Sequence, residues 1–96
     1  MAIALVSGAS RGIGRATARL LAQEGYTVAV NYHRQRDAAD EVVTAIQALG
    51  GKAFAVQADI SDESQVEAMF ARIDEEGLPL TALVNNAGIL FQQSRV

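Results

Sequence analysis

The chain of 96 residues is long enough for one small domain, and half of its residues are hydrophobic, enough for a core. The net charge of −3 argues against a nucleic-acid partner. The chain has no cysteine, which excludes disulfides and thiolate chemistry. The lack of cysteine is also typical of a cytoplasmic protein. The apolar stretch at the N-terminus is too short for a signal peptide or a membrane span, so we expect no membrane association.

Apolar runs alternate with helical periodicity along the chain. Continuous apolar or β-branched runs predict four buried strands, and apolar side chains spaced three and four residues apart predict three helices. The expected strands are residues 3–6, 27–30, 53–56 and 80–84. The expected helices are residues 14–24, residues 37–49, and a third that follows Ser61 as its N-cap and ends before Gly77 and Pro79.

The order of these elements, β-α-β-α-β-α-β, predicts an α/β fold. Right-handed crossovers between parallel strands give a doubly wound parallel sheet of the Rossmann type, in strand order 3-2-1-4. The first two helices would cover one face of this sheet and the third helix the other. The fourth strand would then be a bare apolar edge. We therefore expect an incomplete sheet, with residues 1–96 forming the N-terminal part of a single Rossmann-type domain.

Ligands of open α/β sheets bind beyond the carboxyl ends of the strands, where the strand order reverses. Two unusual loops meet there, since SGASRGIG follows the first strand and NNAG follows the fourth. Residues 1–36, which include the first loop, carry five arginines against one acid, a local charge of +4. Residues 37–96 carry three bases against ten acids, a local charge of −7. A small anionic ligand is therefore expected at the first loop.

The loop SGASRGIG has the composition of a phosphate cradle. A helix that begins within it directs free N–H groups at the loop, glycines allow close approach, and Ser10 and Arg11 add side-chain donors. Only three residues separate Gly8 from Gly12 and no lysine follows, which argues against a P-loop. A phospho-receiver domain would need an acidic cluster at the strand ends, and the first strand ends in Ser-Gly-Ala-Ser.

Three motifs occur in order, each at a strand end. They are Gly8-x-x-x-Gly12-Ile13-Gly14 after the first strand, Asp59 after the third, and Asn85-Asn86-Ala87-Gly88 after the fourth. In this arrangement the whole chain resembles the short-chain dehydrogenase/reductase family, and most of all its bacterial 3-oxoacyl-carrier-protein reductase or glucose/ribitol dehydrogenase type. The one departure is Ser7, where the family commonly has threonine, and both side chains carry a hydroxyl.

The resemblance implies a site for a nicotinamide dinucleotide. The residues around the cofactor phosphates and the adenosine ribose would be Gly8, Ser10, Arg11, Gly12, Ile13 and Gly14. Asp59 would accept the adenine amino proton, with the backbone of Ile60 beside it. The residues between the ribose and the nicotinamide would be Asn86, Ala87 and Gly88. An alternative reading makes Asp59 a helix-entry residue beside Ser61.

The end of the second strand favours NADP(H) over NAD(H). An NAD site usually has an acid about 20 residues beyond the glycine loop, which binds the ribose 2′-hydroxyl. Here the sequence reads NYHR, and no acid appears before the next helix. Asn31, Tyr32 and Arg34 would not repel a 2′-phosphate, and Arg11 adds positive charge from the glycine loop. The only histidine, His33, could contact the phosphate, but it is interpreted as a surface residue of the same loop.

The resemblance implies hydride transfer between NADP(H) and the carbonyl or alcohol group of a small-molecule substrate, by a cytoplasmic homo-oligomer, a dimer or a tetramer. The family's catalytic tyrosine, lysine, serine and asparagine lie after the NNAG loop. Tyr26 and Tyr32 flank the second strand without a lysine four residues on, and Lys52 is the only lysine. We therefore assign no catalytic residue, and no metal site is expected. The alternative is a non-catalytic dinucleotide-binding sensor or regulatory module.

Overall fold

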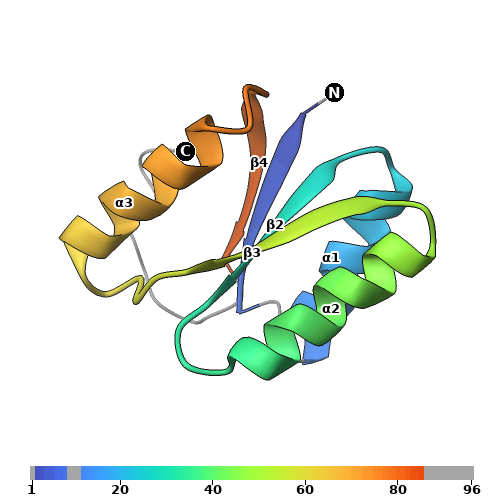
Figure 1. Ribbon diagram of the computed structural model, residues 1–96, viewed down its shortest axis with the longest axis horizontal. Helices are drawn as coiled ribbons and strands as arrows, with labels where there is room; N and C mark the ends of the chain where they lie inside the picture. The colour runs from blue at the N-terminus through green and yellow to red at the C-terminus, as the bar shows by residue number, and fades with distance from the viewer. Residues whose placement is uncertain (1, 9–11, 86–96) are drawn as a thin grey trace.

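The computed structural model describes residues 2–8 and 12–85, in which strands and helices alternate (Figure 1). The strands are β1 (Ile3–Ser7), β2 (Thr27–Tyr32), β3 (Lys52–Gln57) and β4 (Leu80–Asn85). The helices are α1 (Gly12–Gln23), α2 (Arg36–Ala48) and α3 (Glu63–Asp74). Every element expected from the sequence is present, with bounds that differ by one or two residues.

The four strands form one parallel sheet in the order β3-β2-β1-β4. In the register, Leu5 of β1 lies opposite Ala29 of β2 on one side and Leu83 of β4 on the other. The predicted α/β fold and strand order are confirmed. All four carboxyl ends consequently lie at the same edge of the sheet, and the reversal of strand order falls at β1.

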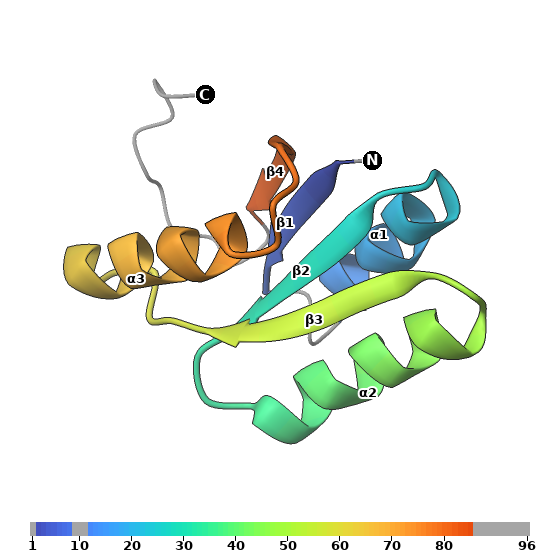
Figure 2. The ribbon, with the colours of Figure 1, turned by 45° about the horizontal axis from the view of Figure 1, so that its top comes forward.

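The helices lie on both faces of the sheet, α1 and α2 on one and α3 on the other (Figure 2). Because successive strand residues point to opposite faces, each central strand feeds two cores. Val28 and Val30 pack with Val6 beneath α1 and α2, whereas Leu5 and Ala29 pack beneath α3. This arrangement explains why the central strands are continuous apolar runs without alternation.

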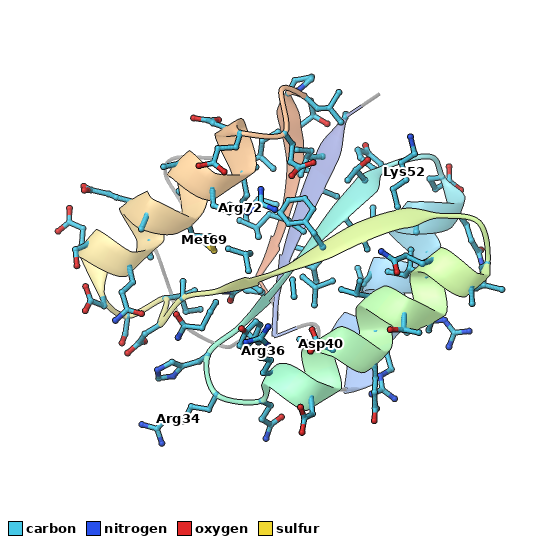
Figure 3. All side chains as sticks on the ribbon, in the orientation of Figure 1. Arg34, Arg36, Asp40, Lys52, Met69 and Arg72 are labelled. Atoms are coloured by element: carbon cyan, nitrogen blue, oxygen red, sulfur yellow. The ribbon has the colours of Figure 1, made fainter. Side chains whose placement is uncertain are left out.

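Several side chains of α3 pack against the sheet, among them Met69 and Ile73. Met69 points from α3 toward the sheet (Figure 3) and is buried. The guanidinium of Arg72 lies 4.6 Å from the centre of the Phe54 ring on β3, so its charge covers an aromatic side chain that the helix leaves half-buried. Leu83 on β4 remains 52% exposed. As expected, the fourth strand presents an apolar side chain at the edge of the sheet.

The start of α3 differs from the expectation. Asp62, not Ser61, is the N-cap, and its Oδ1 accepts hydrogen bonds from the backbone N–H of Ser64 at 3.0 Å and of Gln65 at 3.4 Å. The Ser61 cap was therefore a wrong prediction. The physical reason is that the Ser61 hydroxyl donates to Asp59 and Asp62 is left to satisfy the free N–H groups of the helix.

None of the helices described is long and apolar enough to cross a membrane.

Candidate cofactor site

The first part of the candidate site is the connection from β1 to α1. β1 ends at Ser7, whose Oγ donates to the carbonyl oxygen of Val84 on β4 at 3.4 Å. Gly8 follows with φ of 69°, a left-handed conformation that glycine adopts without a steric penalty. α1 begins at Gly12, so the N–H groups of its first turn and the positive end of its dipole lie next to the carboxyl ends of the strands.

The second part is the junction between β2 and β3, which is held by Asn31. This side chain is only 3% exposed. Its Nδ2 donates to the carbonyl oxygens of Val56 and Ala58, both at 3.3 Å, and of Tyr32 at 3.5 Å. The Ala58 N–H adds a bond of 2.9 Å to the Tyr32 carbonyl. Asn31 thus fastens the ends of two strands, and its predicted contact with a cofactor stays a prediction.

The loop after β2 lies beside the loop after β3. Nε2 of Gln57 donates to the His33 carbonyl oxygen at 3.1 Å, and Nε2 of His33 lies 3.7 Å from Oδ2 of Asp59. Arg34 extends from the same loop away from the ribbon (Figure 3), and it has no hydrogen bond or ion pair with any residue of the described part of the chain. Its guanidinium is therefore available to an anionic ligand at this edge.

Asp59 carries the negative charge of this region. Its Oδ1 accepts hydrogen bonds from the Ser61 hydroxyl at 2.6 Å and from the Ser61 backbone N–H at 3.0 Å. These two bonds lower the pKa of Asp59 below its ordinary value, and the charges of His33 and Arg34 lower it further. Asp59 is thus an ionised acceptor at neutral pH. The backbone N–H of Asp59 is held by the side chain of Gln65 at 2.8 Å.

The structure brings several of the predicted residues to one edge of the sheet. Gly8 and the start of α1 lie after β1, the half-buried Tyr32 and the exposed Arg34 lie at the end of β2, and Asp59 with the buried Ile60 follows β3. The predicted site residues Ser10, Arg11, Asn86, Ala87 and Gly88 lie outside the described residues, as does the side chain of Ile13.

Two supporting residues were missed by the sequence interpretation, Gln57 and Gln65. Gln65 stands three residues after Asp62, and this spacing of an acid and a glutamine is a recognisable signature of a helix start. Gln57 gave no such signal, because an exposed glutamine at the end of a strand is common and its partner, the His33 carbonyl, is 24 residues away in sequence.

The sequence model of the short chain dehydrogenases matches residues 2–96. The chain belongs to the short-chain dehydrogenase family. This result confirms the resemblance that the three motifs indicated.

Individual members of the short-chain dehydrogenase family are similar over nearly the whole chain. An uncharacterized oxidoreductase of Escherichia coli K12, YgfF, is 70% identical over 96 residues, which are 39% of its length. The 3-oxoacyl-[acyl-carrier-protein] reductase FabG of Staphylococcus aureus Mu50 is 51% identical over 90% of the chain and 35% of its own length. A metagenomic short-chain oxidoreductase in complex with NADP superposes with a TM-score of 0.85 at 34% identity, over 92% of this chain and 39% of that one. The chain thus spans little more than a third of these relatives.

Proposed function

We propose that this chain is the cofactor-binding part of an NADP(H)-dependent oxidoreductase that transfers hydride between the nicotinamide and a carbonyl or alcohol group. The observation that carries the proposal is the convergence of the Gly8 turn, the start of α1 and the carboxylate of Asp59 at one edge of a sheet in the order 3-2-1-4. Family membership supports it, and relatives named as an oxidoreductase and a reductase favour an enzyme over a non-catalytic sensor.

The residues present fit a dinucleotide. The left-handed Gly8 precedes the start of α1 by four residues, and a helix N-terminus favours a pyrophosphate, while the ionised Asp59 can accept a hydrogen bond from the amino group of adenine. The residues assigned to the phosphates and adenosine ribose are Gly8, Ser10, Arg11, Gly12, Ile13 and Gly14. Asp59 and Ile60 are assigned to the adenine, and Asn86, Ala87 and Gly88 to the nicotinamide side. When bound, the nicotinamide supplies or accepts the hydride.

NADP(H) is preferred in this proposal because the 2′-phosphate would meet cations. The guanidinium of Arg34 is exposed and unpaired among residues 2–8 and 12–85, and Arg11 belongs to the adjacent glycine loop. Asn31 and Tyr32, at the end of β2, carry no negative charge that would repel the phosphate. The complex of a similar oxidoreductase with NADP supports the same choice.

The substrate is proposed to be a small carbonyl or alcohol compound. The similarity to a 3-oxoacyl-[acyl-carrier-protein] reductase makes 3-oxoacyl thioesters the first class to assay, alongside simple ketones. We propose a cytoplasmic homo-oligomer, a dimer or a tetramer, as the working form of the intact protein. Consumption of NADPH by the intact protein with one of these substrates would support an enzyme, whereas tight NADPH binding without turnover across the panel would favour the sensor.

The cofactor preference is tested by titrating NADPH and NADH into the intact protein and following the fluorescence of the reduced nicotinamide. We expect NADPH to bind more tightly, and Arg11→Ala to weaken NADPH by about tenfold or more while NADH is unaffected, because one charge-assisted hydrogen bond is lost. Arg19→Ala is the matched control, since Arg19 is an exposed arginine on α1. Tighter binding of NADH, or an unchanged NADPH affinity in Arg11→Ala, would contradict the assignment.

A further inference from the structure

The two carboxylate oxygens of Asp59 have different surroundings. Oδ1 accepts both the hydroxyl and the backbone N–H of Ser61, at 2.6 and 3.0 Å. Oδ2 accepts neither of these and lies 3.7 Å from Nε2 of His33. Ser61 therefore fixes the orientation of the carboxylate and leaves Oδ2 as the oxygen that a ligand can reach. The imidazole of His33 lies beside that same oxygen.

The backbone of His33 is held in this place by its neighbours. Nε2 of Gln57 donates to the His33 carbonyl at 3.1 Å, and the preceding carbonyl, of Tyr32, accepts the Ala58 N–H at 2.9 Å. The side chain itself is 45% exposed and that of Asp59 is 31% exposed. The pair is thus anchored through the backbone, while the imidazole remains open to solvent protons and can turn away from Asp59.

We propose that His33 is a positioning residue that, when protonated, occupies Oδ2 of Asp59, so that an adenine nucleotide must displace a proton-dependent ion pair to bind. The inference rests on the proposed function, in which Asp59 accepts a hydrogen bond from the amino group of adenine. A protonated imidazole attracts the carboxylate, whereas a neutral imidazole releases it more easily. The affinity for adenine should therefore be lower when the imidazole is protonated than when it is neutral.

Other charged groups near His33 do not provide an equivalent pair. Arg34, the next residue, is a hydrogen-bond donor without an acceptor atom and so cannot pair with a protonated imidazole. Arg36, at the start of α2, is paired with Asp40 at 3.7 Å (Figure 3). The carboxylate of Asp62, the N-cap of α3, accepts hydrogen bonds from Ser64 and Gln65. Among the residues described, Asp59 is the one carboxylate within ion-pair distance of His33.

The identity of the base provides a specific readout. The amino group of adenine donates to Oδ2, but hypoxanthine has a carbonyl oxygen at this position and can only accept. A protonated His33 competes with adenine and can donate to hypoxanthine. The preference for adenine over hypoxanthine should thus shrink in acid, an effect that a merely structural role of His33 would not produce.

The test is calorimetric titration of the intact protein with ADP-ribose and with its hypoxanthine counterpart, at about pH 5.5 and about pH 8, on either side of the ordinary histidine pKa. Neither ligand carries a 2′-phosphate or a phosphate that titrates in this range. We expect the adenine preference to fall by about two- to fivefold in acid, the strength of an exposed ion pair. His33→Gln should remove this change, and Arg36→Gln, which deletes a neighbouring cation, should preserve it.

The outcomes separate the two proposals. If adenine is preferred equally at both pH values, or if the pH dependence persists in His33→Gln, the role of His33 is overturned while the proposed function stands. If adenine is not preferred over hypoxanthine at either pH, Asp59 does not contact the base, and both the role of His33 and the adenine assignment are overturned. Because His33 is exposed, its substitution should leave the fold intact.

Discussion

The two halves of the candidate site are built differently. At the β2–β3 side, side chains hold the backbone in place, since the amide of Asn31 donates to carbonyls of both strand ends and Ser61 fixes the carboxylate of Asp59. At the β1 side, the described part of the loop contributes backbone, through the left-handed Gly8 and the N-terminus of α1 that follows. A base is recognised by fixed side-chain acceptors, whereas a phosphate needs exposed N–H groups and room, which glycine provides.

The strongest way to break the β2–β3 side is Asn31→Asp. The substitution replaces a buried donor by a carboxylate that faces the carbonyl oxygens of Val56 and Ala58. We expect the free energy of unfolding to fall by about 3 kcal/mol or more, because a buried charge would lack a partner. Chemical denaturation of the intact protein measures this loss.

The matched control is Gln57→Glu, the same change from amide to acid on the exposed end of β3. It removes one exposed hydrogen bond to the His33 carbonyl, and we expect a loss below about 1 kcal/mol. Similar losses for the two variants would show that the buried amide of Asn31 is not what joins the strand ends.

Gly8→Ala at the β1 side is expected to lower the free energy of unfolding less than Asn31→Asp does, but to weaken NADPH binding more. Gly8 and Gly77 have nearly the same left-handed conformation, with φ of 69° and 73°, and Gly77 lies after α3 at the opposite edge of the sheet. Alanine at either position should cost about 1–2 kcal/mol of stability through backbone strain.

Binding should separate these two glycine variants. Gly8→Ala is expected to weaken NADPH, since both the loop backbone and the space for a phosphate change, whereas Gly77→Ala should retain the wild-type affinity. Fluorescence titration gives the comparison. Equal NADPH affinities in the two variants would place the phosphates away from the loop that follows β1.

The fold could be predicted from the sequence because its signals are local. Runs such as Ile3–Val6 are buried on both faces, and the helical spacing between them leaves only parallel crossovers. The strand ends were less predictable, since β2 continues through the polar Asn31. The burial of Asn31 could not be predicted from its neighbours in the sequence. The carbonyl groups that accept its hydrogen bonds belong to Val56 and Ala58, which lie 25 and 27 residues further along the chain.

The sequence predicted which motifs form the candidate site, but it did not predict which atoms of each side chain make the contacts. The sequence offered two interpretations of Asp59, as an acceptor for the cofactor or as a partner of Ser61. The structure places Oδ1 on Ser61 and leaves Oδ2 toward His33, so one carboxylate can serve both purposes. The wrong prediction of the α3 N-cap has a similar cause. Asp59 and Asp62 can both accept hydrogen bonds from nearby N–H and hydroxyl groups, and only the geometry shows which donors each carboxylate accepts.

The most direct test of the central claim is hydrogen–deuterium exchange of the intact protein with and without NADPH. If the dinucleotide binds at the carboxyl edge of the sheet, exchange should slow in peptides that cover residues 8–14 and 57–62. Residues 24–26 should not change, although Glu24, Gly25 and Tyr26 help to line a hollow at the opposite edge. Protection confined to residues 24–26, with residues 8–14 and 57–62 unchanged, would contradict the assignment of the site.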